Sequence, residues 1–137
     1  MDKIYLSLEE AQTLIPSLKK DLIKLIRLNK MLSLLNSVEI EYEDDYRTLT
    51  QEILFNKKFH KLSYNFYTLL DKLHKKGCFV KDINKGVIDF YSFFEGREIF
   101  LCWKISEEEI KYWHEVDLGY SARRPVSMIK KTLKNKE

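Results

Sequence analysis

Apolar residues recur every three or four positions along the first half of the chain, which is the period of an amphipathic helix. Ser7 and Glu10 have the spacing of a capping box, so we expect a first helix over about residues 8–36. Pro16 lies inside this helix and removes one backbone hydrogen bond, so a kink or a restart is expected near 14–16. Beyond the proline the apolar stripe consists of Leu18, Leu22, Leu25, Leu28, Leu32 and Leu35.

A second helix is expected over about residues 46–76, ending before Gly77, which can supply a left-handed cap. Its large apolar residues step by four and three, as in the seam of an antiparallel helical pair or coiled coil: Phe55, Phe59, Leu62, Phe66, Leu69 and Leu73. Helices of ~30 residues are ~45 Å long, which is longer than a compact domain of this size needs. A second copy of the chain is the simplest cover for the remaining apolar surface, so we expect a homodimer.

From Cys78 onward the pattern changes from the helical period to that of β-strands. Strands are expected at about 78–83, 87–90, 97–104 and 110–115, joined by short turns, with 91–96 as a connection. The expected fold class is therefore α+β, a long antiparallel helical hairpin followed by a small four-stranded antiparallel β-meander. The acidic stretch 38–45 is expected to be an exposed connection, and 116–125 a loop.

The 137 residues fit one domain, here 1–126, followed by a basic C-terminal tail or short helix at 127–137. A hydrophobic fraction of 45% with 33% charged residues is typical of a globular chain. No apolar run approaches a membrane span and the N-terminus is not a signal peptide, which predicts a cytoplasmic protein without membrane contact. Cys78 and Cys102 are then buried, reduced thiols, although a disulfide or a metal pair remains an alternative.

Strand alternation places Phe100, Cys102 and Lys104 on one face of the expected sheet, and Ile99, Leu101 and Trp103 on the other. Tyr112 and His114 likewise share one face of the last strand. One face must pack on the hairpin, and the other is available for a ligand or partner.

His114 is the only histidine in the strand region, and histidine is the commonest metal ligand. With Asp89, Cys102, Glu115 or Asp117 it could form a metal or acid–base site. The spacings match no known ligand motif, so a hydrogen-bonded structural histidine near a sheet edge is the competing interpretation. Asp82 and Asp89 flank the turn at 84–86, where stabilising the turn is an alternative to catalysis.

Two basic segments suggest further binding chemistry. Arg123 and Arg124 could clamp a phosphate or carboxylate with their planar guanidinium groups, or they could tie their loop to Glu115 or Asp117. Nucleic-acid binding could use the helical cluster Lys57, Lys58 and Lys61 together with the basic tail. The pI of about 8.7 is modest for that role.

Several strings of rare residues resemble the uncharacterised prokaryotic family known as domain of unknown function 2203, over residues from about 5 to 126. They are Leu6–Pro16, Gly86–Phe90, Gly96–Lys104, Ile110–Glu115 and Gly119–Pro125. Ser106 and Tyr91 replace the family's usual Gly and Pro, both at turns. The family supplies no established activity. The resemblance implies that the site residues lie in its signature: Asp89, Cys102, Trp103, Trp113, His114, Glu115, Asp117, Arg123 and Arg124.

Three functions follow as hypotheses. The first is a non-enzymatic binding or interaction module that self-associates through its hairpin and has a protein partner or a second copy. The second is an enzyme or metal-binding protein with a site around His114, Asp89 and Arg123/Arg124. The third is a weak nucleic-acid binder. The sequence identifies no cofactor.

Overall fold

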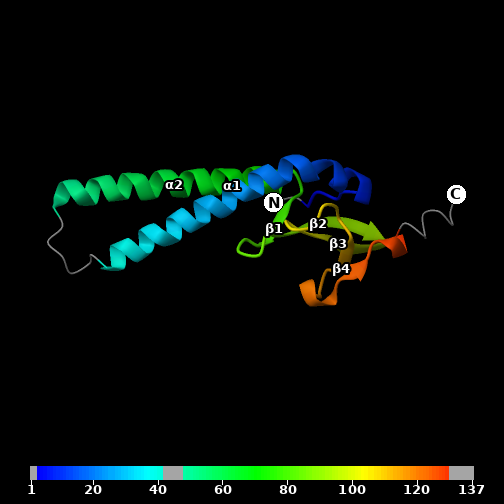
Figure 1. Ribbon diagram of the computed structural model, residues 1–137. Coiled ribbons are helices and arrows are strands. Elements are labelled where there is room, and N and C mark those ends of the chain that lie inside the picture. Colours follow the sequence, from blue (N-terminus) through cyan, green and yellow to red (C-terminus); the bar gives the residue numbers. More distant parts are fainter. Residues whose placement is uncertain (1–2, 42–47, 130–137) are drawn as a thin grey trace.

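Two long antiparallel helices and one antiparallel sheet make up the fold (Figure 1). The structure is a computed structural model that describes residues 3–41 and 48–129. The helices are α1 (Leu8–Glu41) and α2 (Leu49–Lys75). The strands are β1 (Phe79–Asp82), β2 (Val87–Phe94), β3 (Arg97–Lys104), β4 (Tyr112–Glu115) and β5 (Arg124–Pro125), with a 3-10 turn η1 (Tyr120–Ala122) between the last two. The predicted fold class is confirmed.

Helix α1 begins at the predicted capping box, in which the Ser7 hydroxyl accepts from the Glu10 backbone N–H at 3.1 Å and the Glu10 carboxylate accepts from the Ser7 N–H at 3.1 Å. The helix continues without a break through Pro16, so the expected restart there is wrong. It also continues past the predicted end at residue 36, to Glu41. Of the acidic connection expected at 38–45, the first four residues are therefore helical, and 42–47 lie outside the described residues.

Helix α2 begins at a capping box that the sequence also encodes. Thr48 accepts from the Gln51 backbone N–H, and the Gln51 side chain accepts from the Thr48 N–H. The start predicted at residue 46 was therefore early. At the other end Gly77 has φ +90, the left-handed conformation predicted for it, and lets the chain turn directly into the sheet.

The sheet has the strand order β1-β2-β3-β4-β5, all antiparallel. It therefore contains one strand more than predicted, because Arg124 and Pro125 pair with Trp113 and Tyr112. The connection expected at 91–96 is also mostly strand: β2 continues to Phe94, paired with Arg97 across the tight turn at 95–96. Strands β1 and β4 are shorter than predicted. Residues 127–129 form a helical turn, and 130–137, the basic tail, lie outside the described residues.

The hydrophobic core lies between the hairpin and one face of the sheet. Helix α1 contributes Leu18, Leu22 and Leu25, all at most 2% exposed, and the sheet contributes Ile88, Phe90, Ile99, Leu101, Trp103 and Trp113, all fully buried. These are the alternate residues of β2, β3 and β4, as predicted for β3. Burial of this kind contributes roughly 1.5–3 kcal/mol for each large side chain.

The far half of the hairpin extends beyond the sheet (Figure 1). Over residues 26–37 and 49–72 no side chain is buried, and the predicted seam residues of both helices are half-buried there. The two helices are thus the only layer along this half of the hairpin, which we call the arm (residues 26–37 and 49–72).

Candidate functional site

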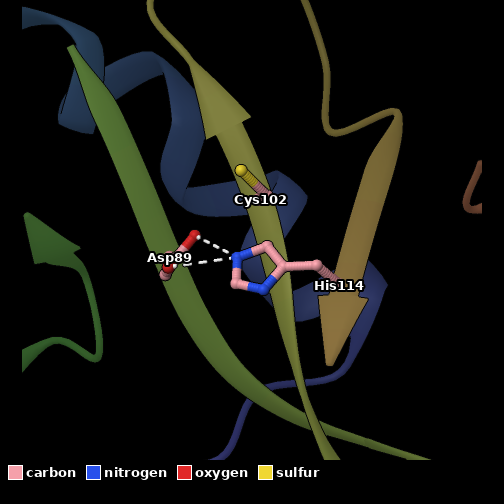
Figure 2. A group of neighbouring side chains, drawn as sticks. All are labelled: Asp89, Cys102 and His114. Carbon is pink, nitrogen blue, oxygen red and sulfur yellow. Dashed lines mark hydrogen bonds and ion pairs between the residues drawn. The ribbon is translucent and has the colours of Figure 1, made fainter. Parts of the chain in front are cut away.

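Buried polar side chains are rare in the described part of the chain, and two of the three lie together. Asp89 is 0% and His114 1% exposed, and the fully buried Cys102 is beside them. One ligand atom of each residue lies within 4.8 Å of the others (Figure 2). The three side chains come from three neighbouring strands, and we call them the Asp-Cys-His cluster.

The register of the sheet explains how they meet. Asp89 lies directly opposite Cys102, and His114 lies opposite Phe100, one same-face position further along. Alternation places all three side chains on the face that points away from the helices. The imidazole of His114 then reaches diagonally across β3 to Asp89, as Figure 2 shows. Asp89 is thus a cluster residue and not a turn residue, whereas Asp82 does stabilise its turn by accepting from the Lys85 N–H at 2.9 Å.

The hydrogen-bond partners of His114 show which of its ring nitrogens carries a proton. Nδ1 lies 2.8 Å from the backbone carbonyl oxygen of Glu115, and because a carbonyl only accepts, Nδ1 carries the proton. Nε2 lies 3.2 and 3.3 Å from the two carboxylate oxygens of Asp89. In neutral imidazole this nitrogen presents a lone pair, which the carboxylate would repel. A positive centre, either a second proton or a metal ion, must therefore lie between Nε2 and Asp89.

Burial has opposite consequences for the two titratable partners of Asp89. Burial acts to lower the pKa of His114, but the hydrogen bonds with Asp89 and the Glu115 carbonyl outweigh it and raise the pKa above 6.5. Burial and then the charge of Asp89 raise the pKa of the Cys102 thiol to about 12. Without a metal the thiol is therefore protonated at neutral pH.

This arrangement argues against a cysteine nucleophile. A catalytic cysteine needs a low thiol pKa and a histidine nitrogen to take its proton. Here the thiol pKa is high, and both nitrogens of His114 already face oxygen acceptors, Nδ1 the Glu115 carbonyl and Nε2 Asp89.

Arg123 contacts the backbone of Cys102 but is not free to clamp a ligand. Its guanidinium lies between the rings of Tyr112 and Tyr120, at 4.1 and 4.5 Å from the ring centroids. It donates to both carboxylate oxygens of Glu107 at 2.6 and 2.8 Å. It also reaches the backbone carbonyl of Cys102 at 3.5 Å. Arg123 thus ties its loop to the protein, as the competing interpretation held, but through Glu107 and not through Glu115 or Asp117.

Arg124 lies on the opposite face of the sheet, the one that packs on the hairpin. Its closest carboxylate is that of Glu115, at a loose 3.7 Å, and Arg97 donates to the same carboxylate at 3.1 Å. Both guanidinium groups lie over the ring of Trp113 and are about half exposed. Arg123 and Arg124 therefore do not form one clamp.

The other predicted site residues are dispersed. Trp103 and Trp113 are fully buried in the core, and the Trp103 indole donates to the Glu107 carbonyl at 2.9 Å. Asp117 is exposed in the loop after β4, and Lys57, Lys58 and Lys61 are exposed on the arm. Glu107, which binds Arg123, was not predicted, because nothing in the spacing of a turn residue indicates a partner 16 positions away.

The arm carries a second feature that the sequence analysis missed. On α2, away from the seam, exposed residues repeat at steps of four, three, four, four and three. We call them the outer stripe: Leu49, Ile53, Asn56, His60, Tyr64 and Tyr67. The exposed fractions of Leu49, Tyr64 and Tyr67 are 73%, 71% and 65%. The signal was present in the spacing, but the more strongly apolar phenylalanine seam dominated the interpretation.

Comparison with known proteins gives a family without an assigned activity. No curated protein and no solved structure matches the chain. Among the described residues no helix is long and apolar enough to span a membrane. The model of the family described as "Uncharacterized conserved protein (DUF2203)" matches residues 4–126, and the chain belongs to this family.

Proposed function

We propose that the protein is an interaction module that self-associates through helix α2 of its arm. The observation that supports this proposal is the outer stripe, whose spacing is that of a helix–helix contact and whose large side chains face solvent. Large aromatic side chains such as Tyr64 and Tyr67 are enriched among the residues that contribute most to the stability of protein interfaces.

The outer stripe is complementary to itself when two copies of α2 run antiparallel. Leu49 then faces Tyr67 of the partner subunit, Ile53 faces Tyr64 of the partner subunit, and Asn56 faces His60 of the partner subunit. Each pair joins a smaller side chain with a larger aromatic or polar one. All three pairings share one two-fold axis near residue 58, which is the condition for a closed, isologous dimer.

The charge of the arm distinguishes a second copy of the chain from nucleic acid as the binding partner. Residues 26–37 and 49–72 carry more basic than acidic side chains, and in the proposed dimer Lys57 faces Lys61 of the partner subunit. Such repulsion between exposed charges is weakened by salt. Nucleic acid binds a basic surface more weakly as the salt concentration increases. The exposed side chains of Leu49 and Ile53 have no group that binds phosphate. Dimer affinity should therefore rise with salt, whereas nucleic-acid affinity should fall.

We place this module in the cytoplasm. Support comes from Cys78 and Cys102, which are free and buried, as is usual for proteins of a reducing compartment.

Sedimentation equilibrium of the full chain tests the function. We expect a monomer–dimer equilibrium whose dissociation constant decreases from low to moderate salt. The double substitution Tyr64→Lys with Tyr67→Lys should give monomers with unchanged helical circular dichroism. A wild-type protein that stays monomeric at high micromolar concentration would refute self-association. Salt-sensitive retention of that monomer on DNA would favour the nucleic-acid function instead.

A further inference from the structure

The Asp-Cys-His cluster combines three donor types that one kind of metal ion prefers. Carboxylate, thiolate and imidazole together are typical ligands of zinc and of ions that replace it. Calcium and magnesium instead require six or more oxygen ligands, and this cluster offers only the carboxylate of Asp89. The chemistry of the donors therefore favours a borderline or soft transition metal.

The orientation of His114 provides a second, independent argument. A histidine that binds a metal through one nitrogen usually donates its other N–H to a backbone carbonyl or a carboxylate, which fixes the ring. The Nδ1–H of His114 donates to the Glu115 carbonyl at 2.8 Å. Nε2, which faces Asp89, is therefore the nitrogen available to bind a metal ion. A proton shared between His114 and Asp89 would also satisfy this geometry, but it would give Cys102 no role.

Charge balance permits a divalent ion in place of the shared proton and the thiol proton, because the metal-free and the metal-bound cluster are both neutral. One divalent cation, the Asp89 carboxylate, a Cys102 thiolate and a neutral His114 imidazole sum to zero net charge. A neutral cluster suits a site where all three residues are at most 1% exposed. On binding, the thiol proton of Cys102 and the proton between His114 and Asp89 are released to solvent, so the charges remain balanced.

We propose that Asp89, Cys102 and His114 form a binding site for one Zn²⁺ or Co²⁺ ion, coordinated through a carboxylate oxygen, Sγ and Nε2. Among the described residues no fourth acidic, cysteine or histidine donor joins the group, so an exogenous ligand or water completes the coordination. The ion joins β2, β3 and β4, which carry one ligand each. This metal centre is independent of the α2 dimer, which lies on the arm.

Cobalt titration of the chelator-treated full chain tests the site, because a thiolate ligand gives Co²⁺ a charge-transfer band in the near ultraviolet. We expect this band to saturate at one ion per chain and Zn²⁺ to displace the cobalt. Cys102→Ser should lose the band and bind Zn²⁺ at least tenfold more weakly in competition with a chromophoric chelator. Cys78→Ser is the matched control, because Cys78 is the other free, buried cysteine and lies outside the cluster. It should retain both properties.

Three results would overturn the proposal. They are a wild-type protein without a saturable cobalt spectrum, a Cys102→Ser variant that keeps the charge-transfer band, and a Cys78→Ser variant that loses it. Circular dichroism and thermal unfolding without metal establish that each variant is folded. Native mass spectra of the zinc-loaded chain count ions without relying on any spectrum. If Asp89→Asn or His114→Gln does not fold, the nearly isosteric Cys102→Ser still decides the question.

Discussion

Leu49→Ala and Leu54→Ala are a matched pair of substitutions that separates the outer stripe from general apolar exposure. Both leucines lie on α2 and are largely solvent-exposed, at 73% for Leu49 and 61% for Leu54. Leu49 belongs to the outer stripe, whereas Leu54, one residue after Ile53, points about 100° away around the helix. Only Leu49→Ala should weaken the dimer.

The magnitude follows from the exposed fraction. Shortening leucine to alanine removes roughly three carbon groups, worth about 0.8 kcal/mol each when buried. If the dimer buries the exposed 73% of Leu49, the loss is about 1.7 kcal/mol per copy. An isologous interface contains the residue twice, so the total is about 3.5 kcal/mol, or roughly a 300-fold rise in the dissociation constant.

Sedimentation equilibrium at several concentrations measures both dissociation constants, and circular dichroism checks that helix content is unchanged. We expect Leu54→Ala to stay within about threefold of the wild type, because its contacts do not change on association. Equal weakening by both substitutions would mean that association is non-specific. An effect of Leu54→Ala alone would place the contact on another side of α2 and refute the proposed pairing.

Three further predictions concern charge, metal and protonation. Raising ionic strength from about 0.01 to 0.15 M should tighten the dimer, because the Lys57–Lys61 repulsion across the interface is screened, and gel filtration at both salt concentrations would show the shift. Zn²⁺ at about 100 times its dissociation constant should stabilise the fold by about 2.7 kcal/mol and raise the melting temperature by roughly 10 °C, with no such shift in Cys102→Ser by scanning calorimetry. In the metal-free protein, NMR titration should give His114 a pKa above 6.5, and Asp89→Asn should lower that pKa. Because the folded pKa is raised, the contribution of His114 to stability is complete below about pH 6.5 and is lost as the pH rises through the folded value.

The sequence predicted the elements well where periodicity was strong and local. The two helices, the turn at 84–86 between β1 and β2, and the faces of β3 follow from the residues along one segment. The capping box at Thr48 was equally readable and was overlooked. The extension of β2 to Phe94 and the pairing of β5 were not readable in this way, because a strand exists only when a partner is in register.

The candidate site shows the same limit. Asp89, Cys102 and His114 were among the predicted metal candidates, together with Glu115 and Asp117, from residue type and the family signature. Their meeting depends on the register of three strands, which no local pattern specifies. The same signature contained Trp103 and Trp113, which the structure places in the core, so a string of rare residues does not distinguish packing from chemistry.

Distances between spin labels on two copies of the chain test the antiparallel α2 dimer most directly. A label at Lys57→Cys lies beside the two-fold axis, so the two labelled positions should be offset by only about 3 Å along the helix axis. A label at Thr68→Cys should be offset from its counterpart by about 30 Å along the same axis. Pulsed electron paramagnetic resonance should therefore give a short distance for Lys57→Cys and a much longer one for Thr68→Cys. Similar distances for both labels would indicate parallel helices, and no dipolar coupling for either would indicate a monomer. Each result would contradict the antiparallel α2 dimer.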